Sequence, residues 1–325
     1  MHASGSLSQR APFAKSGGLH RHIAKFYLSS HDLRVATGPH QAPTRMQTIL
    51  PVIVIYRIRL SQAASYTSLI RAAGISRFVV YDNSPADFEQ EDIAALCPEA
   101  LYVRDTANSG LPRAYNLAAR KAEEWGYTRV LLLDQDTSFP PEAWHCYQHA
   151  AGYTGITAPL AVTAQGQTFS PYDPSVRRRT PAGLSAGEYS LHRFYVINSG
   201  MCVPVALFKQ TGGYNERITL DFSDFQFLMH VRRHSPRFLL LPFSIEQDFS
   251  NDVRDASRLL TRFAIYLRCA AACETEGWQH LLAHHYYVLR HTLALTAKCR
   301  STRFLHLYLR FLLKGNPQPP TAPQA

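Results

Sequence analysis

Short apolar runs rich in β-branched residues alternate with amphipathic stretches from residue 49 onward, and this alternation predicts a sheet covered by helices. The stretch 110–125 has the clearest helical period, because Leu111, Ala114 and Ala118 recur on one face and Gly126 follows its end. The predicted strands are 49–56, 77–81, 100–103, 129–133 and 155–162. The predicted helices are 61–73, 88–96, 110–125 and 140–151.

The alternation breaks after residue 163. The segment 165–193 is polar, is interrupted by Pro and Gly, and contains three consecutive arginines. A loop of this length inside a compact domain is usually functional or disordered. The next predicted elements are a strand at 195–203, a helix at 222–233, a strand at 238–241 and two or three basic amphipathic helices at about 255–314.

These patterns predict an α/β domain at 46–252 that is followed by a basic, amphipathic helical extension at 253–314. The flanking segments 1–45 and 315–325 have the composition of disordered tails, the first basic and the second Pro-rich. No run approaches 18 consecutive apolar residues, so no spanning helix is expected. The first 45 residues also lack the apolar region and cleavage site of a secretory signal.

The net charge of +10 is concentrated at the two ends of the chain. Residues 1–45 carry six Lys/Arg against one acidic residue, and residues 253–314 carry ten against three, whereas residues 46–252 carry eighteen against twenty. This distribution favours an anionic surface as the partner of the ends. We expect lipid rather than nucleic acid, because the basic residues of the extension are interleaved with aliphatic ones and no nucleic-acid-binding module is visible.

Six scattered cysteines form neither a zinc pattern nor a disulfide framework, which favours a reducing cytoplasm. We therefore predict a cytoplasmic protein that is peripheral on the inner face of the plasma membrane. The apolar arcs of two helices, near 258–271 and 303–314, are predicted to lie in the membrane interface. His284 and His285 fall in a basic helix and are expected on its solvated surface.

Two acidic residues follow the fourth predicted strand directly. In open α/β sheets, ligands bind beyond the carboxyl ends of the strands, so Asp134 and Asp136 are in the right place to hold a cation. Carboxylate oxygens suit a hard divalent ion and leave positions for substrate phosphates. The alternative is that both acids cap the helix that begins near Pro140.

Polar residues also follow the second and third strands. Asp82 and Asn83 end one strand, where a carboxylate can accept hydrogen bonds from a nucleobase or ribose, although such a segment is also a common turn. Asn108, Gly110 and Asn116 surround the start of the next helix, whose N-terminus suits an anion; each alone is equally consistent with a helix cap.

Together and in this order, these segments resemble glycosyltransferase family 2, the inverting enzymes of GT-A fold, and most closely a rhamnosyltransferase-like subgroup. The resemblance extends over roughly residues 48–250. The matching segments are PVIVIY (51–56), VVYDNS (79–84), NSGLPRAYNLA (108–118), VLLLDQDT (130–137) and NSGMCVPVALFKQTGGYNERITLDFSDFQF (198–227). The resemblance implies a nucleotide-sugar-binding domain with a mostly parallel sheet flanked by helices, followed here by the helical extension.

The resemblance also implies roles for individual residues. Asp82 would contact the nucleobase, with Arg104 a weaker candidate nearby. Asp134 would lie at the donor ribose or in the metal shell, and Asp136 would bind the Mg²⁺ or Mn²⁺ that bridges the diphosphate. Asn83, Asn108, Gly110 and Asn116 complete the predicted donor-binding set.

The family carries its catalytic base in an acidic pair at the start of the helix after the G-G-Y turn. Here the candidates are Asp224 first and Asp221 second, because Gln226 stands where relatives often have an acid. Gln247 occupies the approximate position of a metal-facing His in many relatives, followed by Asp248. The amide oxygen of Gln is an adequate donor for Mg²⁺ but a poor ligand for a transition metal.

The implied reaction transfers a sugar with inversion to a hydroxyl of a glycan or lipid-linked acceptor in cell-surface polysaccharide synthesis. The first donor expected is dTDP-rhamnose and the second is a UDP-hexose. A sugar-phosphate nucleotidyltransferase is the alternative enzyme, but it predicts a Gly-rich loop after the first strand, where residues 56–60 contain no glycine. A catalytically silent membrane protein that binds nucleotide-sugar is the alternative outside the enzymes.

Overall fold

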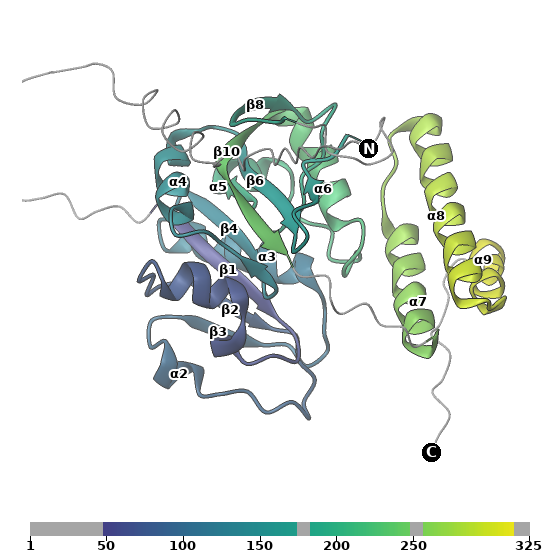
Figure 1. Ribbon diagram of the computed structural model, residues 1–325, viewed down its shortest axis with the longest axis horizontal. Helices are drawn as coiled ribbons and strands as arrows, with labels where there is room; N and C mark the ends of the chain where they lie inside the picture. Colours follow the sequence, from purple (N-terminus) through teal and green to yellow (C-terminus); the bar gives the residue numbers. More distant parts are fainter. Residues whose placement is uncertain (1–47, 174–182, 248–255, 315–325) are drawn as a thin grey trace, which may run out of the picture. The chain divides into compact units, whose positions relative to one another are not determined.

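The computed structural model describes residues 48–173, 183–247 and 256–314, and it confirms an α/β domain with a central sheet flanked by helices (Figure 1). The sheet has the strand order β3-β2-β1-β4-β9-β6-β10-β5, with β7 paired to β6 and β8 paired to β10. Its first four strands are parallel, so their carboxyl ends meet at one edge. They are β3 (Leu101–Arg104), β2 (Val79–Asp82), β1 (Ile49–Ile55) and β4 (Arg129–Asp134).

The second half of the sheet mixes directions. The strand β9 (Cys202–Pro204) runs antiparallel between β4 and β6 (Ile156–Thr163), while β10 (Arg237–Gln247) is parallel to β6. Three short strands complete it: β5 (Thr137–Ser138), β7 (Thr168–Ser170) and β8 (Gly187–Ser190). The pairing of β5 with the end of β10 brings the segment after β4 against Gln247.

Helices cover both faces of the sheet and form two apolar cores with it. One core contains residues of α3 (Leu111–Glu124), α5 (Val205–Gln210) and α6 (Ser223–His234). The other contains residues of η1 (Leu60–Gln62), η2 (Tyr66–Arg71), α2 (Ile93–Leu96) and α4 (Ala143–His149), with η3 (Ala150–Gly152) following α4. All seven residues of β1 are buried between these layers.

Several predicted elements differ in the structure. The helix expected at 61–73 is a 3₁₀ turn followed by a six-residue π-helix, and the helix expected at 88–96 is confined to Ile93–Leu96. The strand expected at 195–203 is wrong over most of its length. Only its end forms β9, because the chain turns at Asn198–Met201 with Gly200 at φ 78°.

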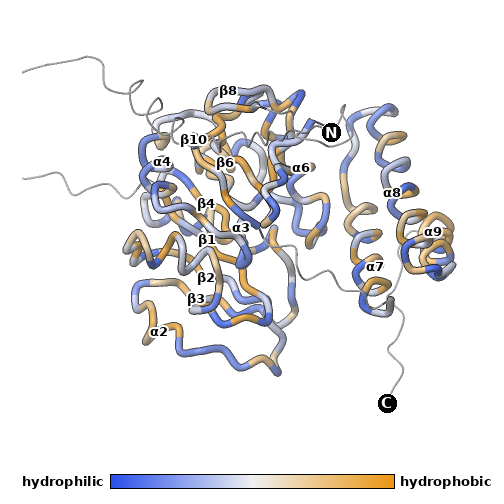
Figure 2. Tube along the Cα trace, in the orientation of Figure 1, coloured by the Kyte–Doolittle hydropathy of each residue, from blue (hydrophilic) through white to orange (hydrophobic). Residues whose placement is uncertain are grey.

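Three helices form the C-terminal extension: α7 (Ala256–Ala272), α8 (Gly277–Cys299) and α9 (Arg303–Lys314). Hydrophobic and hydrophilic residues alternate along them, which confirms their amphipathic character (Figure 2). The arcs predicted to enter a membrane, however, pack mainly on each other: Phe263 and Leu267 of α7 and Phe304 of α9 are almost completely buried in one cluster. The α7 arc and the side of α9 that contains Phe304 are therefore covered by protein, while Leu312 of α9 is exposed, and the membrane association of the extension stays a prediction.

Among the described residues, no helix has the length and apolar character needed to cross a bilayer. The predicted domain boundaries stay predictions, and both predicted tails, the three arginines at 177–179 and Asp248 lie outside the described residues.

Candidate functional site

The turn after β4 fixes the two aspartates predicted to hold a cation. The side-chain oxygen of Gln135 accepts a hydrogen bond from the backbone N–H of Tyr56 at 2.7 Å, and its backbone oxygen accepts one from Ala64 at 2.8 Å. Asp136 accepts a hydrogen bond at Oδ1 from Nε2 of Gln247, 3.2 Å away at the end of β10. The turn is thus tied to β1 on one side and to β10 on the other.

Asp134 lies in an unfavourable place for a negative charge. Burial, together with the charges of Asp136 and Asp224, raises the pKa of its carboxyl group to about 7, although the hydrogen bond from Tyr115 Oη at 3.3 Å acts in the opposite direction. Because repulsion of this kind falls off with distance, the three carboxylates share one neighbourhood although Asp224 is 90 residues away in sequence. A buried acidic group of this kind binds either protons or a cation.

The carboxylate oxygens at the end of β4 fit a cation that is also bound by a phosphate group of its substrate. No group of three or more His, Cys, Asp or Glu in the described ranges could hold a metal by itself, so the protein does not offer a closed cage there. Mg²⁺ commonly takes only one or two carboxylates and fills its other positions with water and substrate phosphates. Asp136, with Asp134 beside it, has the chemistry for that arrangement.

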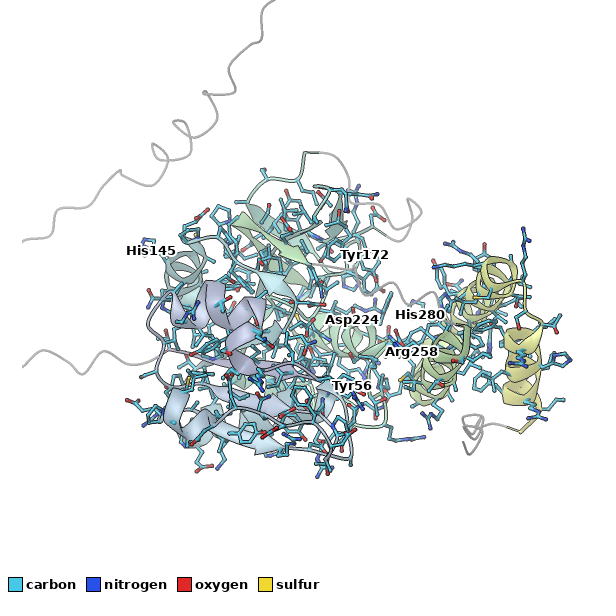
Figure 3. All side chains as sticks on the ribbon, turned by 60° about the horizontal axis from the view of Figure 1, so that its bottom comes forward. Tyr56, His145, Tyr172, Asp224, Arg258 and His280 are labelled. Atoms are coloured by element: carbon cyan, nitrogen blue, oxygen red, sulfur yellow. The ribbon has the colours of Figure 1, made fainter. Side chains whose placement is uncertain are left out.

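The two acids at the start of α6 have different partners. Both carboxylate oxygens of Asp221 contact the guanidinium group of Arg262 on α7, one of them at 2.8 Å. Asp224 accepts a hydrogen bond from the backbone N–H of Phe225 and acts electrostatically on Asp134 and Tyr115. Figure 3 shows Asp224 at the side of the α/β domain nearest to α7. The geometry thus favours Asp224 over Asp221 as the acid that serves the end of β4.

A buried hydrogen-bond chain holds the beginning of α6 in place. Asn198 donates to Ser223 Oγ at 3.1 Å and accepts from Tyr214 Oη at 2.7 Å. Asn116 of α3 then binds the backbone of Tyr214 on both sides, through its Nδ2 at 2.9 Å and its Oδ1 at 2.8 Å. Asn116, predicted to contact the donor, therefore has a structural role, because its hydrogen bonds link α3 to the G-G-Y turn.

Asp82 is completely buried at the end of β2 and is held by several groups of the protein itself. Its Oδ2 accepts hydrogen bonds from Tyr102 Oη at 2.8 Å and Arg104 Nη1 at 3.0 Å, and its Oδ1 accepts one from the backbone of Ser84. Arg104 also donates to the carbonyl oxygens of Pro85 and Phe88. The pair thus shapes the loop after β2, and its contact with a nucleobase stays a prediction.

Of the remaining predicted donor contacts, Gly110 and Asn108 have structural roles, whereas Asn83 has an unsatisfied hydrogen-bond acceptor. Gly110 lies against backbone, because a Cβ atom there would come 2.1 Å from the carbonyl oxygen of Thr219. Asn108 has φ 51° in the turn before α3 and donates its backbone N–H to Asp105. Asn83 is 4 % exposed and its Oδ1 has no hydrogen-bond partner, so it is the predicted contact with an acceptor atom still to satisfy.

Sequence reasoning missed Tyr115 and Arg262. Tyr115 lies within the segment that carries the resemblance, one helical turn after Leu111, and that spacing could have placed it on the buried face of α3 toward β4. Arg262 gave no such signal, because its contact with Asp221 joins residues 41 positions apart in two different elements.

No family model matches the sequence, and no curated protein matches it. Similar solved structures include TarS residues 1–349 of S. aureus in complex with UDP, with 13 % identity, a TM-score of 0.44 and coverage of 82 % of this chain and 75 % of that one. The same fragment with UDP-GlcNAc has 13 % identity, a TM-score of 0.45 and coverage of 82 % and 76 %. GalNAc-T7 with UDP, GalNAc and Mn²⁺ has 12 % identity, a TM-score of 0.47 and coverage of 85 % and 59 %. These similar structures are GT-A-type glycosyltransferases.

Proposed function

We propose that this protein is an inverting glycosyltransferase that uses a nucleotide-sugar donor. The observation that carries the proposal is the gathering of Asp134 and Asp136, at the end of β4, with Asp224, at the start of α6, in one electrostatic neighbourhood. Two carboxylates suit the cation of a nucleoside diphosphate, and a third is available to accept a proton. Sugar transfer from such a donor requires both functions.

The chain's own residues have separate tasks in this mechanism. Asp224 accepts the proton of the acceptor hydroxyl as its oxygen attacks the anomeric carbon, and a single in-line displacement inverts the configuration. A carboxylate is a weak base, so its effect depends on the positioning that the Asn198–Ser223 contact gives to α6. Asp136 and Asp134 would hold the divalent cation, which would supply positive charge to neutralise the departing diphosphate.

The donor and acceptor follow from the sequence resemblance. dTDP-rhamnose is the first donor proposed and a UDP-hexose the second, and the acceptor is a hydroxyl of a glycan or lipid-linked saccharide in cell-surface polysaccharide synthesis. A sugar-phosphate nucleotidyltransferase is disfavoured because the segment after β1 has no glycine-rich phosphate loop. There the backbone N–H of Arg57 is already bonded to Ser84 Oγ at 2.7 Å.

A thermal-shift screen of nucleotide-sugars with Mn²⁺ tests the proposal. Ligand binding to the folded state raises the midpoint in proportion to the logarithm of ligand concentration over Kd, so the correct donor should give the largest shift. EDTA should remove most of that shift and also stop donor hydrolysis. A protein that binds a donor but neither hydrolyses nor transfers it would be the silent binder, and a protein that no nucleotide-sugar stabilises would contradict the proposal.

We also propose that α8 and α9 bind an anionic membrane surface. Nine of the twelve large hydrophobic residues exposed in the described part of the chain lie on these two helices. On α8, Trp278, Leu282, Tyr286, Leu289 and Leu293 lie within one narrow arc of the helical wheel. We therefore propose that this exposed face of α8, rather than the buried parts of the arcs near 258–271 and 303–314, contacts the membrane.

The charge of the same helices supports a lipid partner. Residues 277–314 contain six Lys/Arg and no acidic residue. A second copy would present a face of the same sign and would be repelled, whereas an anionic bilayer attracts the basic residues and takes up the apolar ones. All six cysteines are unpaired, which supports a reducing compartment and hence the cytoplasmic leaflet.

Vesicle flotation tests the membrane proposal. The fraction of protein recovered with vesicles should rise with anionic-lipid content and fall with salt. It should also fall for Leu289→Glu, which places a negative charge in the exposed arc of α8. Leu96→Glu is the matched control, because Leu96 is 41 % exposed and Leu289 is 38 % exposed, but Leu96 belongs to the α/β domain. Equal recovery of the wild type at every lipid composition would contradict the membrane proposal.

A further inference from the structure

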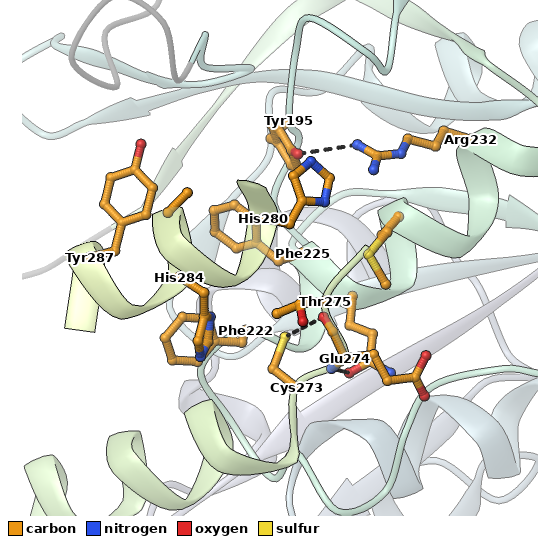
Figure 4. Close-up of a pocket in the computed structure, with 13 residues that line it drawn as sticks. Tyr195, Phe222, Phe225, Arg232, Cys273, Glu274, Thr275, His280, His284 and Tyr287 are labelled. Carbon is orange, nitrogen blue, oxygen red and sulfur yellow. Dashed lines mark hydrogen bonds between the residues drawn. The ribbon is translucent and has the colours of Figure 1, made fainter. Parts of the chain in front are cut away.

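A cavity lies between α6, residues 273–275 and α8, and its lining includes none of the three carboxylates of the candidate site (Figure 4). Its volume is about 130 Å³. Aromatic and imidazole rings form much of its wall: Tyr195, Phe222, Phe225, His284 and Tyr287. The expected solvated position of His284 is wrong, since its Nε2 is 3.0 Å from the carbonyl oxygen of Ala270 and its ring is 5.2 Å from that of Phe222.

The charged groups at this cavity already have partners within the protein. Arg232 binds Glu276 and also donates to Tyr195 Oη at 3.4 Å. Glu274 Oε2 is 3.0 Å from Nε2 of His230, a pair with opposite charges only when the imidazole is protonated. An anionic ligand would therefore find the guanidinium group of Arg232 already paired and a carboxylate nearby, so the cavity suits a neutral ligand better than an anionic one.

Gln226, one of the residues that line the cavity, has an unused hydrogen-bond donor. Its side chain is 3 % exposed, and its Oε1 accepts the backbone N–H of Glu274 at 3.2 Å. Its Nε2, however, has no hydrogen-bond partner. A buried amide left in this state is costly, so a ligand that supplies an acceptor oxygen here gains more than an ordinary polar contact would give.

These features select the chemistry of the ligand. A cavity near 150 Å³ is about large enough for one six-membered ring. Aromatic walls suit the apolar faces of a ring, but a hydrocarbon ring would leave the amide of Gln226 unpaired. A pyranose satisfies both demands, because it has C–H faces for stacking and hydroxyl oxygens that accept a hydrogen bond.

We propose that this cavity is a subsite for one pyranose ring of the acceptor glycan, beyond the sugar that reacts. The assignment to an acceptor rests on the proposed transferase function. Phe222, Phe225 and Gln226 lie within two residues of Asp224 at the start of α6, so a ring held here lies one helical turn from the proposed base. The reacting sugar is a different one, because Asp224 does not line the cavity.

Saturation-transfer NMR with methyl pyranosides tests the subsite in the full chain. The probes are the methyl glycosides of rhamnose, glucose, galactose and N-acetylglucosamine, with methylcyclohexane as a hydrocarbon ring that has no acceptor oxygen. At least one pyranoside should bind more tightly than methylcyclohexane. Equal or tighter binding of methylcyclohexane, or the absence of saturation transfer to every pyranoside, would overturn the proposal.

Two neighbouring tyrosines of α8 provide a matched pair of variants. Tyr287→Ala removes part of the cavity wall and should weaken the best pyranoside about fivefold or more. Tyr286→Ala removes a ring that belongs to the proposed membrane-binding face, is 60 % exposed and does not line the cavity, so in the absence of vesicles it should leave pyranoside affinity unchanged. Gln226→Met keeps the side-chain length but removes the donor, and it should also weaken binding about fivefold. Equal weakening by both tyrosine variants would contradict the assignment.

Donor binding measured on the same samples separates this proposal from the proposed function. A wild type that nucleotide-sugars stabilise, but that no pyranoside binds, leaves the transferase proposal standing and removes the subsite. A wild type that binds pyranosides, but that no nucleotide-sugar stabilises, removes the transferase proposal and with it the assignment to an acceptor. An unchanged thermal midpoint in Tyr287→Ala shows that any lost binding does not come from unfolding.

Discussion

The ends of β2 and β4 have the same design in sequence but opposite environments in the structure. Each is a buried strand of the parallel half of the sheet that finishes in an aspartate. Asp82 is surrounded by donors, including the cationic group of Arg104. Asp134 receives a hydrogen bond from Tyr115 but lies near two like charges, and no ion pair of Asp134 is found within the described ranges.

This difference separates an acid that stabilises the fold from one that destabilises it. A carboxylate with a complete set of donors adds to the stability of the loop after β2. A carboxylate held beside two others lowers stability unless a proton or a cation compensates it. Groups of the second kind occur where a protein binds a charged ligand, which is why the end of β4 is the better candidate for chemistry.

The largest expected effect is on turnover and concerns the third carboxylate near β4. Asp224→Asn should lower kcat by roughly 10²- to 10³-fold with little change in donor affinity, because a base acts on the acceptor. Steady-state kinetics with varied donor and acceptor measures this. Asp221→Asn is the control and should have a smaller effect, since Asp221 is paired with Arg262. A larger loss in Asp221→Asn than in Asp224→Asn would reverse the assignment.

The next effect concerns stability at the end of β2. Asp82→Ala should lower the free energy of unfolding by about 3 kcal/mol, because it leaves Arg104 and Tyr102 without their buried acceptor. Urea denaturation measures the change. Asp87→Ala, at a residue whose side chain is 74 % exposed in its contact with Arg57, should change stability very little. Equal stability of the two variants would remove the contrast between the strand ends.

A smaller effect of opposite sign is expected at β4. The pKa of Asp134 is raised in the folded state, so ionising it opposes folding, and Asp134→Asn should stabilise the metal-free protein. The gain should grow from about pH 4, near the unfolded pKa, to about pH 7, and then stay constant. We expect on the order of 2 kcal/mol at pH 8, measured by thermal unfolding. A gain that shrinks as pH rises would contradict the account.

Most of the parallel half of the sheet could be predicted from the sequence. Its strands β1, β2 and β4 are almost entirely buried, so each appears as a mostly apolar run, and the predicted bounds of β1 and β4 agree with the structure within one residue. The strands β5, β7 and β8 could not be found, because they have two to four residues and take their pairing from β6 or β10. Such pairings depend on tertiary contacts rather than on local pattern.

The candidate site was predictable where the residue type itself states the chemistry. Asp134 and Asp136 are predicted from their acidity and their place directly after a strand, whereas Asp224 comes from the family resemblance. The roles of Asn116 and Asp221 could not be predicted in the same way, because they depend on Tyr214 and Arg262, distant partners that only the fold brings near. The amphipathic pattern of α7 likewise does not say whether lipid or another helix covers its apolar side.

Calorimetric titration of UDP and of dTDP, with Mn²⁺ or with EDTA, tests the central claim most directly when wild type is compared with Asp136→Ala. At least one nucleotide should bind the wild type ten times or more tightly with Mn²⁺ than with EDTA, at an ionic strength held constant, by an enhancement of about 1.4 kcal/mol or more. Asp136→Ala should lose that enhancement and unfold at an unchanged midpoint. A wild type with equal affinity in EDTA, or a folded Asp136→Ala that keeps the enhancement, would contradict the assignment of the cation to the end of β4.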